Sequence, residues 1–255
     1  MGSAVAGPVV SLPWSPEEPV PQALADAVRR GRHTIELISE PAWRESSADA
    51  YAGLDRDSGG GAGARGMVRI VPLPVGVVDG RERAIDLALR AIDAWRAGFD
   101  AISIEVRDEG APPVPGPALE YAAWRQLSTR LCGRRFEAEV PVADGVRALL
   151  AHGARGTALV LWNESGGDEL AVELDFGSQP IRATDLWGRT QEPRRGRDGH
   201  ALRVGREPLF VEGVSREMCL FRRGFKVDPV FAESRRAPQE GVLVLSNPWE
   251  SAISG

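Results

Sequence analysis

The order of regular elements changes once along the chain, near Arg134, and this change limits the folds that the chain can adopt. Before that point the hydrophobic pattern alternates between strand and helix, and after it short strand patterns follow one another without a helix between them. Alternating strands and helices are typical of parallel β/α units. A run of short strands is typical of an antiparallel sandwich. We therefore expect an α/β part followed by an all-β part.

Two longer segments of the first part have helical periodicity, and four short apolar segments have the composition of strands. The helix predicted over residues 79–97 has the clearest pattern, because its apolar residues recur at helical spacing. Asp79 can cap its start and Gly98 can end it. A second helix is predicted over residues 118–132. The predicted strands are residues 8–14, 33–38, 67–73 and 100–106, and weaker helical patterns lie at residues 21–30 and 41–54.

The second part is organised around three predicted strands, which we expect to pair in chain order as a meander. Residues 157–162 form a continuous apolar run, as expected of a strand covered on both faces. Residues 170–176 alternate between apolar and polar, which places one face in a core and the other in water. Residues 181–187 form the third strand. Further strands are predicted at residues 136–142, 146–152, 201–204, 208–214, 218–221 and 242–245.

Charge and composition exclude several classes of partner and cofactor. The net charge is −5, whereas proteins that bind nucleic acid are usually basic. No apolar run approaches the roughly 20 residues of a membrane span, and no signal peptide is visible, so we expect no membrane partner and leave the compartment open. Cys132, Cys219 and the three histidines share no metal-ligand spacing, and residues 61–66 fit G-x-G-x-x-G but precede a strand. We expect no metal and no cofactor.

Several stretches resemble the carboxyl-terminal part of bacterial glycoside-hydrolase-like proteins, in which a (β/α)8 barrel (a TIM barrel) is followed by a small all-β domain. They are RAIDLALRAIDAWRAGFDAISIE, LEYAAWRQLSTRLCGRRFEAEVPVADGVRALL, ALVLWNE, ATDLWGR and REPLFVEG. The resemblance implies that residues 1–133 are a partial (half) β/α barrel with parallel strands, and that residues 134–216 are an antiparallel β-sandwich. Residues 217–255 either join the sandwich or begin a truncated immunoglobulin-like domain.

The catalytic residues of such enzymes cannot be carried over to this chain. Retaining glycosidases use two carboxylates about 5–5.5 Å apart, and the resemblance implies that one follows the fourth barrel strand and the other follows the seventh. The segment that would be the seventh strand, residues 67–73, has no carboxylate near its end. The fourth strand would lie in the missing half. We therefore expect no complete active site.

Glu105 and Glu40 are the carboxylates that we select as candidate catalytic residues. Both lie at the carboxyl ends of predicted parallel strands, which carry the sites of β/α barrels. By alternation, Glu105 lies on the face of its strand opposite Ile102 and Ile104. Glu40 lies close to Trp43. The other acids at such positions are Glu36, Asp108 and Glu109.

Trp43 and Trp187 are the candidate carbohydrate-binding residues, because aromatic rings stack on sugars. Trp187 lies in ATDLWGR, where Asp185 shares its face and can accept a hydrogen bond from the turn. A structural corner is therefore the alternative interpretation of Trp187. Trp162 ends the continuous apolar strand and is expected in the core.

Taken together, these patterns indicate a fragment of a carbohydrate-active protein, without a complete active site and with a structural sandwich. Two alternatives stay open. The chain is either a non-catalytic carbohydrate-binding module, or a structural or assembly module. In the assembly case, open sheet edges would pair with the missing barrel half or with another copy of the chain.

Overall fold

The computed structural model describes the strands, the helices and most of the connections in the second part of the chain. The described residues are 9–14, 34–39, 67–73, 79–99, 101–105, 119–165, 167–177, 179–193, 195–196, 199–224, 226–228, 242–244 and 248–249. The helical patterns at residues 21–30 and 41–54, the glycine-rich segment at 61–66, and the candidate residues Glu40 and Trp43 lie outside them.

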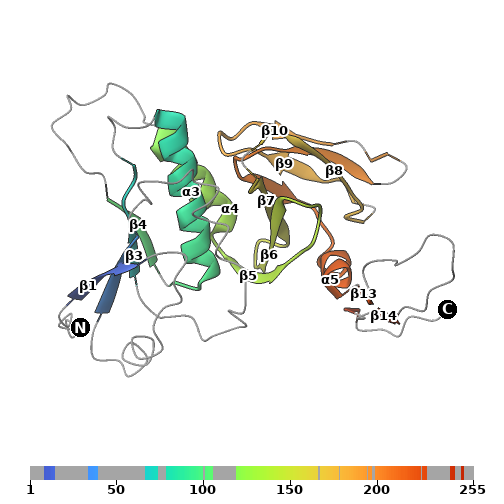
Figure 1. Ribbon diagram of the computed structural model, residues 1–255, viewed down its shortest axis with the longest axis horizontal. Helices are drawn as coiled ribbons and strands as arrows, with labels where there is room; N and C mark the ends of the chain where they lie inside the picture. The colour runs from blue at the N-terminus through green and yellow to red at the C-terminus, as the bar shows by residue number, and fades with distance from the viewer. Residues whose placement is uncertain are drawn as a thin grey trace.

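The first part contains a four-stranded parallel sheet, which lies on the left in Figure 1. The strands are neighbours in chain order, β1-β2-β3-β4, and every pair is parallel. Parallel strands in consecutive order agree with the β/α units that the alternating pattern predicts, and all four predicted strands are confirmed. Their bounds are β1 Val9–Trp14, β2 Thr34–Ser39, β3 Met67–Ile70 and β4 Ala101–Ile104.

Two helices form a layer between this sheet and the second part of the chain (Figure 1): α3 (Gly80–Arg96) and α4 (Leu119–Leu131). The start of α3 is capped by Asp79, whose Oδ1 accepts from the main-chain N–H groups of Arg81 and Glu82 at 2.7 and 2.9 Å. Gly98 follows its end with a φ of 81°, as predicted. Within the described residues, no helix has the length and apolar composition needed to cross a membrane.

Helix α3 is buried on more than one side, because it packs between two sheets. Every residue from 84 to 94 is buried. Val68 and Ile70 of β3 belong to the same apolar cluster as Val160 and Trp162 from the second part. Trp162 is 2% exposed, which confirms its predicted place in the core. One hydrophobic core therefore continues across the change of pattern near residue 134.

The second part consists of two antiparallel layers. The inner layer is a six-stranded sheet with the order β10-β9-β12-β7-β6-β5. The outer layer is the pair β8 and β11, which lies to the right of the helices in Figure 1. The bounds are β5 Arg134–Glu139, β6 Val146–Gly153, β7 Ala158–Asn163, β8 Leu170–Leu174, β9 Arg182–Thr184, β10 Thr190–Gln191, β11 His200–Val204 and β12 Leu209–Glu212.

The predicted meander is wrong, because β7, β8 and β9 are not neighbours. β7 pairs with β6 and β12, β8 pairs with β11, and β9 pairs with β10 and β12. The burial patterns give the physical reason. All of Ala158–Asn163 is buried, so β7 requires cover on both faces, from the helices on one side and from β8 and β11 on the other. Strand β8 alternates between exposed and buried, as an outer layer does.

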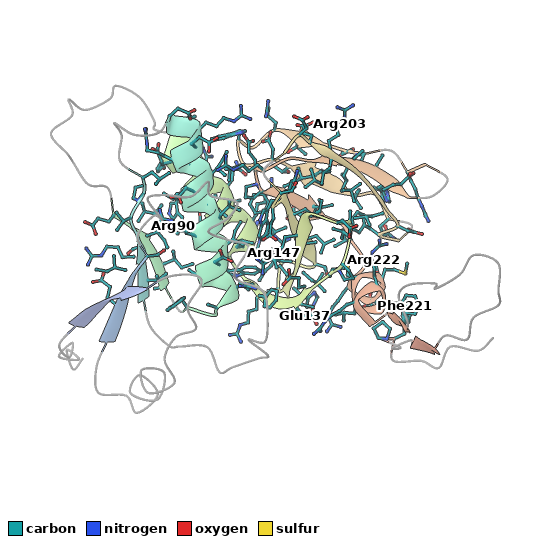
Figure 2. All side chains as sticks on the ribbon, in the orientation of Figure 1. Arg90, Glu137, Arg147, Arg203, Phe221 and Arg222 are labelled. Atoms are coloured by element: carbon teal, nitrogen blue, oxygen red, sulfur yellow. The ribbon has the colours of Figure 1, made fainter. Side chains whose placement is uncertain are left out.

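The strand predicted at residues 218–221 is also wrong, because this segment lies in helix α5 (Arg216–Gly224). Ser215 caps the helix: its Oγ accepts from the main-chain N–H of Met218 at 3.2 Å. Cys219 packs into the core of the sandwich. Arg222 donates to the carbonyl of Pro141, and both Arg222 and Phe221 are labelled on α5 in Figure 2. Beyond α5, β13 (Lys226–Asp228) pairs antiparallel with β14 (Val242–Val244).

Arg134, at the predicted boundary, ties the helix layer to the sandwich. Its side chain is 4% exposed. It donates to the carbonyl oxygens of Arg130 in α4 and of Arg155 and Gly156 in the turn after β6, and to the carboxylate of Glu212 in β12. One buried guanidinium therefore satisfies acceptors from both parts of the chain.

Candidate functional site

The parallel sheet has two chemically different faces. Val68 and Ile70 of β3 are fully buried, and Ile102 and Ile104 of β4 pack against the same apolar cluster as α3. Arg69 alternates with Val68 and Ile70, so its side chain leaves the sheet on the opposite face. The sheet therefore turns an apolar face to the helices and a charged residue away from them.

Arg69 lies between two carboxylates from the neighbouring strands. Its Nη2 and Nε contact the two carboxylate oxygens of Glu36 at 2.6 and 3.0 Å, and its Nη1 contacts Oε2 of Glu105 at 2.6 Å. Glu36 comes from β2, Arg69 from β3, and Glu105 directly follows β4. We call these three residues the charged triad. The triad crosses three adjacent parallel strands, with Glu105 at a carboxyl end, where sites form in β/α folds.

The two carboxylates stabilise the charged form of Arg69 and determine the net charge of the triad. The hydrogen bonds that Arg69 donates, first to Glu36 and then to Glu105, raise the pKa of its guanidinium above its usual value. The Arg69 and Glu105 side chains are 30% and 26% exposed, so water screens their ion pair, whereas the Glu36 side chain is 11% exposed. One positive and two negative charges leave the triad with a net negative charge.

A buried arginine fixes the strands that carry the triad. Arg90 of α3 is 2% exposed and donates from Nη1 to the carbonyl oxygen of Ser39 at 2.6 Å. Its guanidinium also contacts the carbonyl of Val71 and the carboxylate of Asp86. Figure 2 shows Arg90 between α3 and the parallel sheet. Ser39 is the last residue of β2 and Val71 directly follows β3, so Arg90 holds the ends of both strands in place.

Of the four predicted site residues, the structure describes Glu105 and Trp187, and these two lie apart. Glu105 lies in the charged triad, on the face opposite Ile102 and Ile104, as its alternation predicts. Glu36 joins it. Glu40 and Trp43 lie outside the described residues. The prediction overlooked Arg69, although an arginine within the apolar stretch MVRIV is a readable signal, because a charge at an alternating position marks a face turned away from the core.

Trp187 lies apart from the charged triad, in the turn between β9 and β10, and packs against the apolar cluster that includes residues of α3. Its Nε1 donates to Oε2 of Glu207 at 2.6 Å, and the Arg81 guanidinium lies 5.8 Å from the centre of its ring. Oδ1 of Asp185 accepts from the main-chain N–H groups of Trp187 and Arg189. These contacts match the structural corner that was the alternative interpretation of ATDLWGR.

The charged triad offers both hydrogen-bond donors and acceptors on a partly exposed surface. Such a set can bind hydroxyl groups, which donate and accept at once. A general acid, by contrast, must carry a proton, and an arginine between two carboxylates favours their charged forms. Among the described residues, no group of three histidine, cysteine, aspartate or glutamate side chains is arranged to hold a metal ion.

Comparison with solved structures gives the class of fold. The chain is similar to a family 39 glycoside hydrolase from the gut symbiont Bacteroides cellulosilyticus, with a TM-score of 0.50 and 10% sequence identity over 74% of this chain and 36% of that one. A family 30 endoxylanase from Clostridium papyrosolvens matches with a TM-score of 0.45 and 9% identity, over 79% of this chain and 61% of that one. The chain therefore has a glycoside-hydrolase-like fold, and it spans 36% of the length of the first of these proteins.

No match of the sequence to a known family or to a curated protein accompanies this likeness in fold. The likeness therefore rests on the arrangement of the elements, and at 10% identity it defines the fold alone.

Proposed function

We propose that this chain is the carboxyl-terminal part of a carbohydrate-active protein, in which the charged triad forms part of the floor of a saccharide site. Further β/α units would complete the barrel around that floor. Glu36 and Glu105 would accept hydrogen bonds from sugar hydroxyls, and Arg69 would hold both carboxylates and donate to a sugar oxygen. The sandwich would serve to support the helix layer.

The position of the triad is the observation that carries this proposal. Glu36, Arg69 and Glu105 come from three adjacent parallel strands and lie on the face turned away from α3. In a closed barrel, that face points to the interior, and the carboxyl ends of the strands surround the site. The glycoside-hydrolase-like fold supports the choice of a saccharide as the ligand.

We propose binding without hydrolysis by this chain alone. Glycoside hydrolysis needs one carboxyl group that is protonated and a second that attacks or activates water. In the triad, both carboxylates are paired with one arginine, an arrangement that suits binding better than proton donation. The catalytic pair of the complete protein would then lie on other strands.

Isothermal titration with neutral oligosaccharides tests the proposal. We expect weak binding by the unaltered chain, and a loss of about tenfold or more in Glu105→Gln, because a lost charged hydrogen bond is worth about 1.5–3 kcal/mol. Glu192→Gln is the matched control, since Glu192 is exposed and its contact with Arg182 is 3.4 Å long. Equal binding by both variants would contradict the proposal.

Hydrolysis of a panel of aryl glycosides tests the proposal that this chain alone does not cleave glycosidic bonds. We expect no turnover by this chain. Turnover that disappears in Glu105→Gln, while Glu192→Gln keeps it, would mean that the chain is a complete enzyme with Glu105 as a catalytic residue.

An assembly role is the second candidate, and the edges of the parallel sheet favour it. Among the described strands, β1 and β4 each have a single neighbour. A strand edge presents main-chain donors and acceptors that can pair with another strand. The assembly role predicts a dimer or larger oligomer by light scattering after size exclusion, whereas the saccharide-binding role alone predicts a monomer.

A further inference from the structure

A cleft lies where the first turns of α3 meet the turns of the sandwich, away from the charged triad. Its volume is about 400 Å³, which lies within the range of about 300–1,000 Å³ typical of small-molecule sites. Arg81 and Glu82 of α3 form one wall. The turns after β9 and β11 form the other, and Figure 2 shows Arg203 of β11 at the upper margin of the sandwich.

The floor of this cleft is apolar. Ile85 and Leu209 line it and are 3% and 6% exposed. Each belongs to one of the two hydrophobic cores, so the floor is fixed by packing on both sides of the cleft. The small exposed parts of these two side chains can contact C–H groups of a ligand.

The walls of the cleft are charged but balanced. Four arginines line it, and each is paired with a carboxylate that also lines it. The pairs are Arg81 with Glu207, Arg206 with Glu82, Arg189 with Asp185, and Arg203 with Glu169. Equal numbers of both signs give no net field to attract an ion. They do place donors beside acceptors, which suits hydroxyl groups.

Two of the carboxylates are held in place by other groups. Asp185 accepts from the main-chain N–H groups of Trp187 and Arg189, and Glu207 accepts from the indole N–H of Trp187. Their side chains are 20% and 16% exposed. Three of the arginine side chains are far more exposed: Arg81 at 60%, Arg189 at 75% and Arg203 at 82%. The cleft therefore combines fixed acceptors with adaptable donors.

We propose that this cleft is a second binding site, separate from the charged triad, and that its ligand is a neutral saccharide. The apolar floor would contact the C–H face of a sugar ring. Asp185 and Glu207 would accept from its hydroxyl groups, and Arg203 and Arg206 would donate to them. The choice of a saccharide among neutral polyhydroxylated molecules rests on the proposed function, whereas the preference for a neutral ligand rests on the cleft alone.

The indole N–H resonance of Trp187 is the direct readout, because this group is bonded to Glu207 in the cleft. It is assigned by its loss in Trp187→Phe. The probes are cellotetraose, xylotetraose and maltotetraose as neutral ligands, with tetragalacturonate and spermine as charged ones. We expect at least one neutral saccharide to shift this resonance at millimolar concentration, and neither charged probe to do so.

Variants of exposed residues localise the effect without disturbing the core. Arg203→Ala and Glu169→Ala should each weaken the neutral-saccharide titration severalfold, since both side chains are more than half exposed and line the cleft. Arg182→Ala is the control, because Arg182 is also exposed and ion-paired but lies outside the cleft. Glu105→Gln should leave this titration unchanged, which separates the cleft from the charged triad.

Three results would overturn the proposal. They are the absence of a shift with all three neutral saccharides, a shift caused by tetragalacturonate or spermine alone, and equal titrations for Arg203→Ala, Glu169→Ala and Arg182→Ala. A shift that is lost in Glu105→Gln but not in the cleft variants would assign the binding to the charged triad and leave the cleft without a ligand.

Discussion

The carboxylate of Asp93 lies 3.7 Å from the guanidinium Nε of Arg96, one turn further along α3. Asp93 is 3% exposed, and its Oδ1 receives no hydrogen bond from the described residues. Burial raises the pKa of this carboxyl from 3.8 to about 7, against the attraction of Arg96 and Arg147, and the nearby charges of Glu164 and Glu139 raise it further. Figure 2 shows Arg147 between the helices and the sandwich.

This raised pKa predicts that the protein loses stability as the pH rises from about 4 to about 7. In that range the native state keeps the proton of Asp93 and the unfolded state releases it, so the native state binds more protons and a rising pH favours unfolding. Asp93→Asn removes this dependence. At about pH 8 the variant should be more stable than the unaltered chain by roughly 2–4 kcal/mol, measured by urea unfolding.

The same comparison at about pH 5 is the internal control, because there Asp93 is protonated in the native state and the two chains should differ less. A pH dependence of stability that is identical in Asp93→Asn and in the unaltered chain would contradict the prediction.

Arg90→Met should strongly destabilise the protein. The substitution leaves the carbonyl oxygens of Ser39 and Val71 without this donor and removes a partner of the buried Asp86. Removal of one member of a buried ion pair costs about 3–5 kcal/mol. Arg182→Met, at an exposed pair, should cost less than about 1 kcal/mol. Equal free energies of unfolding for both variants would show that Arg90 does not hold the strand ends.

Gly213→Ala and Gly156→Ala compare a closely packed glycine with a loosely packed one. Both glycines have a left-handed φ, 86° and 79°, which costs about 1–2 kcal/mol for a residue with a Cβ atom. A Cβ on Gly213 would lie 2.4 Å from the carbonyl oxygen of Pro180, whereas a Cβ on Gly156 would meet no atom of the described residues within 4 Å. We expect Gly213→Ala to lower the melting temperature at least twice as much as Gly156→Ala. A smaller shift for Gly213→Ala would refute this packing.

Ser215→Ala should weaken α5 by removing its cap. The loss of the hydrogen bond to the N–H of Met218 should cost about 0.5–2 kcal/mol. Ser128→Ala is the control, because Ser128 is exposed within α4 and donates only to the carbonyl of Arg125 in the same helix. Alanine favours a helix interior, so this control should be neutral or slightly stabilising. A neutral Ser215→Ala would mean that the cap contributes nothing.

The sequence predicts how each strand is covered better than it predicts which strand lies beside it. The continuous apolar run of β7 indicates a strand covered on both faces, and the alternating pattern of β8 indicates a strand covered on one; both interpretations are confirmed. The arrangement of these strands depends on the pairing of β7 with β12 and of β8 with β11, whose partners are distant in sequence. No local pattern encodes that choice, so the predicted meander fails.

The error at α5 has a local cause. Met218, Cys219, Leu220 and Phe221 form a short apolar run, and such a run fits a strand or a buried helix equally well. The cap at Ser215 selects the helix, and a serine before an acidic first turn is a readable signal of a helix start. In this short apolar segment, the capping serine therefore indicates a helix where the apolar content alone does not.

The candidate site could be predicted in part. Alternation correctly assigns Glu105 to the face of β4 opposite Ile102 and Ile104. The register of β2, β3 and β4 then brings Glu36 and Arg69 to the same face, and this register depends on the whole sheet. Arg90 gives a misleading signal, because Asp86 and Arg90 at i and i+4 resemble an exposed helical pair, yet both are buried.

The Nε–H resonance of Arg69 in a ¹⁵N spectrum tests the central claim most directly, because this group donates to Glu36 at 3.0 Å in the middle of the charged triad. It is assigned by its loss in Arg69→Lys. We predict that a neutral oligosaccharide shifts this resonance along the same titration curve as the binding isotherm, and that the shift is lost in Glu105→Gln. A resonance that stays in place while the isotherm shows binding would contradict a saccharide site on this face of the sheet.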